Sequence, residues 1–402
     1  MFGFLKIPII SKTSNMLWPF KKVPVIELEN LAVKRAIARV IDERSHYGFT
    51  GHPRVKQFEQ QLSRELFDGI PILGVNSGSD AIVLALKILG IGSGDEVIVP
   101  AFSFISTVST VGWIGATPIF IDITARDYAI DPDQIEKKIT PRTKAIIVAH
   151  LFGHPAIGIQ QICDIAKKHN LSIIEDTAQS LGAKIKIDNT WRMAGTIGNI
   201  GCLSFSSTKP FSAPGNGGAL ILRDKNQYEI ADKMRFYGAE RPYFEYPVIG
   251  INAKLHEVQA AALLAKLNFL DYWLNHRKKL ASLYRENLSG LGDLLLPAEH
   301  PQVQRTWYRY VVRTKQRDRL FAYLKRGLGT KRDLWPTLHY PVPLPYFSVF
   351  KKLGYQFGDF PVSDEMSRET ISLPVTSYVN EKNALNICDL VKEFFANSRE
   401  HS

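Results

Sequence analysis

Residues 202–222, CLSFSSTKPFSAPGNGGALIL, decide how the chain folds around its most unusual residue. The segment opens with a short apolar run, turns through small and polar residues around Lys209, and closes with a second apolar run after paired glycines. Short apolar runs bounded in this way are typical of buried strands. The pattern therefore predicts two strands of a sheet with Lys209 at the corner between them, a position that packing alone does not favour for a lysine.

Short apolar runs also alternate with helical patterns from residue 71 onward. This alternation is typical of βα units, and it predicts an α/β fold with a mostly parallel seven-stranded sheet flanked by helices. The strands are expected over residues 72–75, 96–99, 118–121, 144–149, 171–175, 202–206 and 219–222, and the helices between them over 80–89, 104–114 and 159–169.

The remaining segments give the expected domain organisation. Residues 1–50 are expected to form an N-terminal arm and helix, 51–290 the large domain, and 291–402 a smaller α+β domain. Further helices are expected over 29–46, 53–67, 316–327 and 381–395, one or two long helices over 254–289, and a strand over 308–313.

The composition is that of an ordinary globular protein. Of the 402 residues, 45% are hydrophobic and 22% are charged, and the net charge is +11. The basic residues are dispersed, which leaves two interpretations open: a generally basic surface, or attraction of an anionic substrate such as a nucleotide diphosphate. Nucleic acid is not an expected partner, because no basic run is interleaved with aromatic residues.

Three scattered cysteines, Cys163, Cys202 and Cys388, lack the CxxC spacing of a zinc site. Neither a disulfide framework nor a metal site is expected. A reducing, cytoplasmic location is expected instead. No apolar run approaches the roughly 20 residues of a membrane span. Residues 1–22 hold only broken apolar stretches without a small-residue cleavage site, so a signal peptide is not expected.

A candidate anion site lies at Asn76-Ser77-Gly78-Ser79-Asp80, which follows an expected strand and opens a helix. The unpaired N–H groups and the dipole of a helix N-terminus favour a phosphate there. A plain N-cap, with Ser77 or Ser79 accepting from the first-turn amides, explains the same residues. Both interpretations stay open at this point.

Two further segments follow strand ends, where open α/β sheets bind their ligands. In Phe102-Ser103-Phe104, an aromatic ring can stack on a flat cofactor, although core packing explains these rings as well. Asp176 closes another strand and suits a protonated pyridine nitrogen, with capping of a following helix as the alternative. Gln179 can donate a hydrogen bond to a phenolate oxygen.

Lys209 completes this set of candidate residues. A lysine whose pKa is lowered by partial burial or a cationic neighbour is suited to form an imine with an aldehyde cofactor. Ser204 reaches the same pocket from the preceding strand, and Gly215, Gly217 and Gly218 permit a close backbone approach. A surface lysine is the alternative, but four compatible elements in a consistent order favour the chemical role.

Together these segments resemble the DegT/StrS family of pyridoxal-phosphate-dependent sugar aminotransferases, which have the fold type I aminotransferase architecture. The resemblance runs from about residue 45 to 395. It is carried by VNSGSDAIVLALKILGIGSGDEVIVPAFSFISTVSTVGWIGATPIFIDI, VAHLFGHPA, IIEDTAQSLGA, LSFSSTKPFSAPGNGGALIL, INAKLHEVQAAALLAKL, and LHYPVPL with ISLPV.

The resemblance implies a role for each matching residue around pyridoxal 5'-phosphate. Lys209 matches the family's Schiff-base lysine, and Asp176 matches the carboxylate at the pyridine nitrogen. Gln179 matches the residue near the ring oxygen, and Phe104 matches the aromatic residue stacked on the ring.

The same resemblance implies which residues contact the phosphate, the neighbouring subunit and the sugar. Gly78, Ser79 and Ser204 match the phosphate ligands. Asn252 matches a residue that reaches the phosphate of the neighbouring subunit, which implies a homodimer with shared active sites. His339 and Tyr308 are expected at the sugar site, although packing of the small domain explains both residues nearly as well.

The implied reaction moves an amino group from an amino-acid donor, usually glutamate, to a keto group of a nucleotide-linked sugar. Seven residues separate Lys209 from Gly217. That length resembles members acting on 3-keto sugars more than the shorter loop common among 4-keto enzymes, and a 4-keto substrate stays open. Dehydration, performed by relatives with histidine in place of the lysine, is disfavoured.

Four residues depart from the family's pattern. Pro210 stands where asparagine is frequent, and Asn216 stands where an acidic residue precedes the paired glycines. Ser79 replaces the usual threonine, and Lys254 replaces a frequent arginine. Asn216 removes a charge near the site, which bears on substrate choice and rate. Pro210 and Asn216 together leave open a non-catalytic or regulatory relative that binds cofactor or sugar nucleotide.

Overall fold

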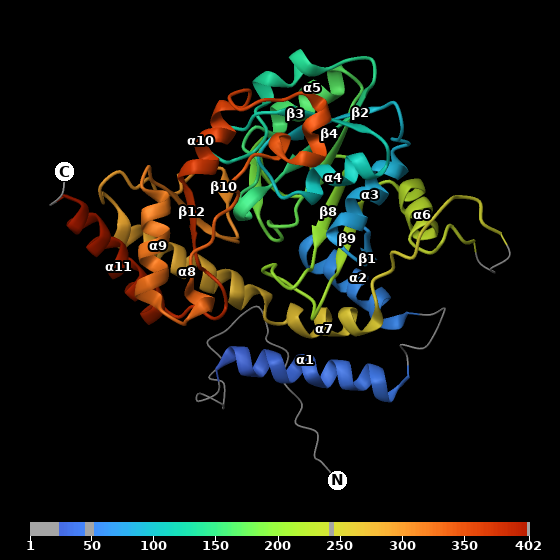
Figure 1. Ribbon diagram of the computed structural model, residues 1–402. Helices are drawn as coiled ribbons and strands as arrows, with labels where there is room; N and C mark the ends of the chain where they lie inside the picture. Colours follow the sequence, from blue (N-terminus) through green and yellow to red (C-terminus); the bar gives the residue numbers. More distant parts are fainter. Residues whose placement is uncertain (1–23, 45–51, 241–244, 400–402) are drawn as a thin grey trace, which may run out of the picture.

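A computed structural model describes residues 24–44, 52–240 and 245–399, and its centre is a seven-stranded sheet (Figure 1). The strand order is β1-β9-β8-β5-β4-β2-β3. The strands are β1 (Ile72–Val75), β2 (Glu96–Pro100), β3 (Thr117–Ile121), β4 (Thr143–Ala149), β5 (Ser172–Asp176), β8 (Ile200–Ser204) and β9 (Gly218–Leu222). Only β9 runs against its neighbours, so the predicted mostly parallel seven-stranded sheet is confirmed.

The strand directions bring distant parts of the sequence to one edge of the sheet. Since β1 and β8 are each antiparallel to β9, they are parallel to one another, and β5, β4, β2 and β3 share their direction. The segments that follow β1, β2, β5 and β8 therefore leave the sheet on the same side. This is the side on which open α/β sheets bind ligands.

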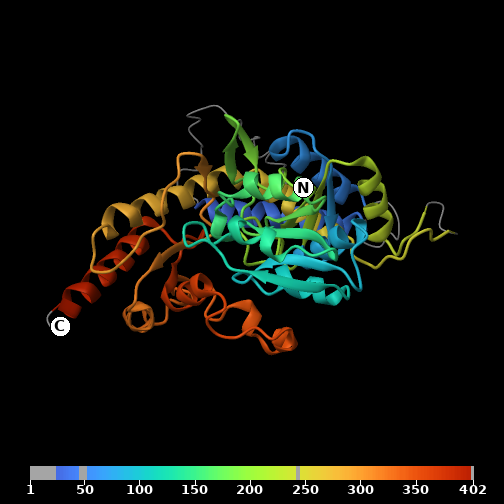
Figure 2. The same ribbon diagram turned by 90° about the horizontal axis from the view of Figure 1, so that it is seen from above.

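Helices cover both faces of this sheet. They are α2 (Pro53–Leu66), α3 (Gly78–Ile88), α4 (Ser106–Trp113), α5 (Ile159–Lys168), α6 (Lys225–Met234) and α7 (Glu257–Leu267). Helices α3 and α4 pack with one set of buried strand residues, whereas α5 packs with the alternate set, and α2 and α7 pack beside it against the sheet's other end. Figure 2 shows the resulting layers from above.

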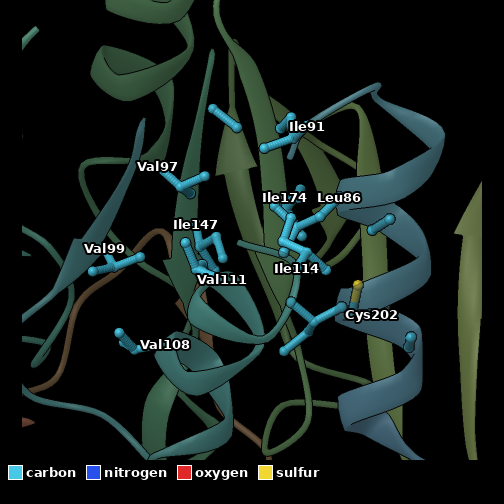
Figure 3. Packing of buried hydrophobic residues seen from close by; sticks show 14 of the residues in the cluster. Leu86, Ile91, Val97, Val99, Val108, Val111, Ile114, Ile147, Ile174 and Cys202 are labelled. Carbon is cyan, nitrogen blue, oxygen red and sulfur yellow. The ribbon is translucent and has the colours of Figure 1, made fainter. Parts of the chain in front are cut away.

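The alternation of strand side chains explains this layering. On β2, Val97 and Val99 belong to the core beneath α3 and α4, whereas Ile98 faces α5 on the opposite side. Figure 3 shows Leu86 and Val111 among strand residues of the first core. Strands buried on both faces read as near-continuous apolar runs, which is why the sequence located them well.

A second core lies toward the C-terminus. It joins α8 (Leu270–Leu288), β11 (Tyr310–Arg313), α9 (Arg317–Leu328), β12 (Thr370–Leu373) and α11 (Glu381–Arg399). Strands β11 and β12 pair antiparallel, and Figure 1 shows these helices to one side of the main sheet. On this basis we propose a boundary between a large and a small domain near residue 290.

The N-terminal helix α1 (Val25–Asp42) packs against α7, as Figure 1 shows. It begins directly after Pro24, four residues before the expected start at 29. The expected arm over residues 1–22 and the end of the helix at 45–46 lie outside the described residues. Among the helices that the structure does describe, none is both long and apolar enough to cross a membrane.

One buried carboxylate joins the C-terminal region to the main sheet. Asp122, just past β3, accepts hydrogen bonds from the N–H groups of Val362 and Ser363, at 2.8 and 2.9 Å, and from the Ser363 hydroxyl. These N–H groups belong to the first turn of α10 (Pro361–Glu369). A carboxylate is favourable at a helix N-terminus because it meets unpaired donors and the positive end of the helix dipole.

Sequence patterns missed several elements. These are β6 (Lys184–Ile187), β7 (Thr190–Met193) and β10 (Val303–Gln304), which form a small separate sheet, and α6, α10 and β12. Strand β6 is buried only at alternate residues and β7 is mostly exposed, so neither forms the apolar run that located the other strands. The expected long helical segment 254–289 is two helices, α7 and α8, separated by Asn268 and Phe269.

Short 3-10 turns occupy the connections between these elements. They are η2 (Pro132–Gln134), η3 (Glu136–Lys138), η4 (Leu151–Gly153), η5 (Arg332–Leu334), η6 (Leu344–Tyr346) and η7 (Ser348–Leu353).

The side chain of Glu175 on β5 anchors the loop that leads into β8. It is completely buried, and its carboxylate accepts hydrogen bonds from the N–H groups of Gly195, Ile197 and Gly198 at 2.6 to 2.8 Å. Burial by itself would raise the pKa of Glu175, but His150 and these N–H groups outweigh it and hold the pKa below its usual value.

His150, just after β4, supplies the fourth donor to this carboxylate. Its Nε2 lies 2.8 Å from Glu175 Oε2, and its Nδ1 accepts a hydrogen bond from the Ala156 N–H at 2.9 Å. Because Nδ1 accepts, the proton of a neutral ring sits on Nε2 and points at Glu175. Glu175 therefore fixes the ends of β4 and β5 and the start of β8 relative to one another.

We expect Glu175→Gln to lower the free energy of unfolding by about 2–4 kcal/mol at pH 7.5, because an amide group replaces a buried anion that four donors surround. The pKa of Glu175 is lower in the folded state, so the advantage of the wild type is complete above about pH 4.3, the value of an unfolded glutamate. It is lost as the pH falls through the folded pKa. Urea unfolding at pH 7.5 and pH 3.5 measures the difference.

Glu365→Gln, which removes a half-buried carboxylate paired with Arg313, is the control and should change stability by less than about 1 kcal/mol. A gap between wild type and Glu175→Gln that stays the same at both pH values would contradict this account of Glu175.

Candidate active site

A cavity of about 570 Å³ opens at the edge where the parallel strands end. Its walls come from the segments after β1, β2, β5 and β8, and from the C-terminal region. Nine of the ten candidate catalytic, cofactor and substrate residues line it: Gly78, Ser79, Phe104, Asp176, Gln179, Ser204, Lys209, Tyr308 and His339.

The turn between β1 and α3 forms one end of the cavity. Ser77 is the N-cap of α3, and its Oγ accepts from the Asp80 N–H at 3.0 Å, so the capping interpretation holds for Ser77. Ser79 is left facing the cavity. A Cβ at Gly78 would lie 2.7 Å from the Cβ of Ser204, so a side chain there would close the space between the turn and β8.

The carboxylate of Asp176 is held from two sides at the end of β5. Thr107 Oγ1 donates to Oδ2 at 2.7 Å, and the Ala178 N–H donates to Oδ1 at 3.1 Å. Ser103 Oγ lies 2.9 Å from Thr107 Oγ1 and extends the chain of hydroxyls. No helix follows β5 before β6, so the helix-capping interpretation of Asp176 is wrong.

The two aromatic residues of the segment after β2 differ in exposure. Phe102 is fully buried, as core packing predicts, whereas the ring of Phe104 is 49% exposed and faces the cavity. A half-exposed ring at a strand end is available to a flat ligand. Across the cavity, Tyr340 lies with its ring centre 6.4 Å from that of Phe104.

Gln179 is oriented by the protein itself. Its Oε1 accepts a hydrogen bond from the Phe152 N–H at 2.9 Å, and its Nε2 donates to Tyr340 Oη at 2.9 Å. The amide is therefore assigned with Nε2 toward the cavity, and one of its two N–H bonds is committed to Tyr340. The second is available to a ligand.

Lys209 lies half-buried at the start of the loop between β8 and β9. Its Nζ is 5.8 Å from the ring centre of Phe104 and 5.4 Å from that of Tyr308, so it faces the cavity between two aromatic walls. The loop is tied down by hydrogen bonds from the Phe205 N–H to Gly217 O and from the Ala213 N–H to Phe205 O.

The C-terminal region adds a positively charged wall. Burial, and then the positive charges of Arg309 and Lys209, lower the pKa of His339 to about 3, so its ring is neutral at neutral pH. The pKa of Tyr308 is also lowered, because the charges of Arg309 and Lys209 outweigh the opposing effect of burial. The positive charges of Arg309 and Lys209 contribute to both shifts.

Asn216, noted as a departure from the family pattern, and Asn252, the cross-subunit candidate, lie in different places relative to the cavity. Asn216 lines the cavity, as its place before the glycines suggested. Asn252 does not line it; it is exposed and pairs with Phe236 in an isolated bridge. Its expected contact with a neighbouring subunit stays a prediction.

Sequence reasoning missed Thr107, Tyr340 and Arg309, all of which line the cavity. Each stands next to or one helical turn from a residue that was noticed: Thr107 follows Ser103 by four positions, Tyr340 follows His339, and Arg309 follows Tyr308. Residue spacing was the available signal, but only the fold shows which neighbours turn inward.

Several known proteins are similar to this chain over most of its length. A Geobacillus stearothermophilus protein named pleiotropic regulatory protein is 36% identical, covering 93% of this chain and 98% of that protein. The dTDP-3-amino-3,4,6-trideoxy-alpha-D-glucose transaminase of Streptomyces venezuelae is 35% identical, covering 89% and 91%. The crystal structure of S. venezuelae DesV in complex with a ketimine intermediate is 34% identical with a TM-score of 0.83, covering 92% and 96%.

The family comparison spans almost all of the described fold. Residues 32–392 match the model of the DegT/DnrJ/EryC1/StrS aminotransferase family. This range contains the seven-stranded sheet, the cavity and most of the second core. The chain therefore belongs to the DegT/DnrJ/EryC1/StrS aminotransferase family, whose members depend on pyridoxal phosphate.

Proposed function

We propose that this protein transfers an amino group from an amino acid, glutamate by preference, to the 3-keto group of a nucleotide-linked sugar. The observation that carries the proposal is the placement of Lys209, Asp176 and the Gly78 turn around one cavity at the common edge of the sheet. The relative named a dTDP-3-amino-sugar transaminase supports the substrate class.

The residues present fit pyridoxal phosphate. A phosphate group suits the start of α3. Gly78 leaves space there that a Cβ, which would meet Ser204, would fill. We assign the phosphate to Gly78, Ser79 and Ser204, the ring to Phe104, the ring nitrogen to Asp176 and the ring oxygen to Gln179. In this assignment the phosphate, the ring nitrogen and the ring oxygen each lie beside residues of suitable charge or hydrogen-bonding capacity.

When bound, pyridoxal phosphate supplies an electron sink for the electron pair left on the carbon that loses a proton. In this proposal Lys209 Nζ would hold the cofactor, and the same amine, when free, would move a proton to and from the reacting carbon. Asp176 keeps a proton on the ring nitrogen, and Thr107 keeps Asp176 oriented through its hydrogen bond to Oδ2.

The walls of the cavity assist these proton movements. Phe104, Tyr308 and Tyr340 present ring surface around Lys209, which limits water near its amine and strengthens charge interactions. His339 is neutral at neutral pH and hydrogen-bonds Ser372 Oγ through Nδ1 at 2.9 Å. Its Nε2 is then the atom that we assign to a sugar hydroxyl.

We further propose that the enzyme works as a homodimer. Asn252 is exposed and lies away from the cavity of its own chain. This position is compatible with the contact to a partner's phosphate that the family resemblance implies.

The position of the keto group is supported by two observations. Seven residues separate Lys209 from Gly217, the length associated above with 3-keto substrates. The S. venezuelae relative is also named for a 3-amino product. A regulatory role is the second candidate, because a relative of 36% identity is named a pleiotropic regulatory protein.

Lys209→Ala should abolish the visible absorption of the purified protein, because the covalent link between the cofactor and the amine is lost. Transamination should fall by at least about 1,000-fold, as expected when the residue that carries the proton is removed. Absorption spectra and single-turnover assays with glutamate check both effects. Lys184→Ala, a half-buried lysine outside the cavity, is the control and should behave as wild type. A visible spectrum that is unchanged in Lys209→Ala would contradict the assignment of Lys209 as the lysine that holds the cofactor.

Steady-state kinetics with glutamate and matched dTDP-linked sugars should distinguish the keto positions. We expect kcat/KM for the 3-keto sugar to exceed that for the 4-keto isomer by at least about 10-fold, or 1.4 kcal/mol of transition-state binding. A preference for the 4-keto sugar would reverse the substrate assignment and leave the transaminase assignment intact. No turnover of either sugar, or of other keto sugars, would favour the regulatory candidate.

A further inference from the structure

We propose that Arg309 is a specificity-determining residue that binds a carboxylate of the substrate, either that of the amino-acid donor or that of a uronate sugar. This inference rests on the proposed function, because it concerns a substrate of the same cavity. Arg309 lines the cavity, and its Nε–H has no acceptor among the described residues. Other basic side chains lie beside it.

Arg309 stands at the junction of two cavities. It lines the main cavity together with Lys209, and it also lines a second cavity of about 330 Å³ on the other side of the Lys209 loop. Its guanidinium carbon lies 4.6 Å from the ring centre of Tyr308, and Lys209 Nζ lies 5.4 Å from the same centre. Arg309 and Lys209 therefore flank one aromatic ring.

Arg309 has no acidic partner within the described ranges. Its Nε–H is buried and donates to no acceptor there, and no Asp or Glu oxygen of the described residues lies within 4.0 Å of its guanidinium. Arg313, four positions on, forms ion pairs with Glu365 and Glu369. A buried donor without an acceptor costs free energy unless a ligand or water satisfies it.

The neighbours of Arg309 add positive charge rather than compensate it. Arg277 is buried and donates to the Trp307 and Tyr308 carbonyls, and burial together with the charge of Arg309 lowers its pKa to about 10. The acidic residues of the second cavity are Glu29 and Asp333, and Glu29 pairs with Lys266 instead. An anion entering beside Arg309 would be attracted by several charges at once.

The planar guanidinium suits a carboxylate in two-point geometry. A donor carboxylate is attached directly to the carbon that must react beside Lys209, so its place near Arg309 follows from the reaction. A uronate carboxylate lies two or three bonds from the keto carbon and reaches the same region. A nucleotide diphosphate is joined to C1, which is two bonds from a C3 keto carbon, so the binding experiment below must separate it from a carboxylate. The cofactor phosphate is assigned to the opposite end at Gly78.

Binding of unreactive probes to the holoenzyme tests the inference without turnover. Glutarate stands for the donor, and UDP-glucuronate and UDP-glucose differ only in the sugar carboxylate. We expect Arg309→Gln to weaken glutarate at least 10-fold if the donor carboxylate binds there. If the uronate carboxylate binds there, UDP-glucuronate weakens at least 10-fold while UDP-glucose is unchanged. Isothermal titration calorimetry measures each dissociation constant.

Arg305→Gln is the matched control, because Arg305 is also half-buried and packs over Trp307 but lines a different cavity. It should leave all three dissociation constants within twofold. Arg309→Lys, which keeps the charge and loses the planar fork, should fall between wild type and Arg309→Gln, and it replaces Arg309→Gln if that variant does not fold.

Three outcomes would overturn the inference: equal weakening of UDP-glucose and UDP-glucuronate, which points to the diphosphate; no change in any dissociation constant; or no binding of glutarate and UDP-glucuronate by the wild type. A protein without transaminase activity that still shows Arg309-dependent carboxylate binding would overturn the proposed function alone. The two failures are therefore distinguishable.

Discussion

The buried carboxylate of Glu175 is the constraint on which the site depends. Three main-chain N–H groups and His150 converge on it, so the ends of β4 and β5 and the start of β8 are fixed to one another inside the sheet. Asp176, the next residue, takes its position from this clamp, and Ser204 takes its position from β8. Leaving a buried charge unpaired costs several kcal/mol, so the arrangement is strongly specified.

Different walls of the cavity supply the different groups that the chemistry needs. The sheet edge supplies small donors at one end, a held carboxylate in the middle and an amine opposite, whereas the C-terminal region supplies aromatic rings and positive charge. Asp122 ties that region to β3 through the first turn of α10, so the two walls keep a defined relation. The cavity is thus negative beside Asp176 and positive beside Arg309.

Much of this fold could be predicted from the sequence, because strands buried on both faces are unbroken apolar runs. Lys209, Asp176 and Gly78 were recognisable because polar residues at strand ends are conspicuous after such runs. The roles of Thr107 and Arg309 could not be predicted, since each depends on contacts across long sequence separations. The hairpin of β6 and β7 was missed because its strands are partly exposed and carry polar residues, so neither forms an unbroken apolar run.

In the proposed mechanism a single lysine, Lys209, carries the cofactor. Borohydride reduction of the purified holoenzyme makes the bond between the protein and pyridoxal phosphate permanent, and peptide mass spectrometry then locates it. The account predicts a single modified peptide that contains Lys209. Modification of a different lysine, with Lys209 unmodified, would contradict it.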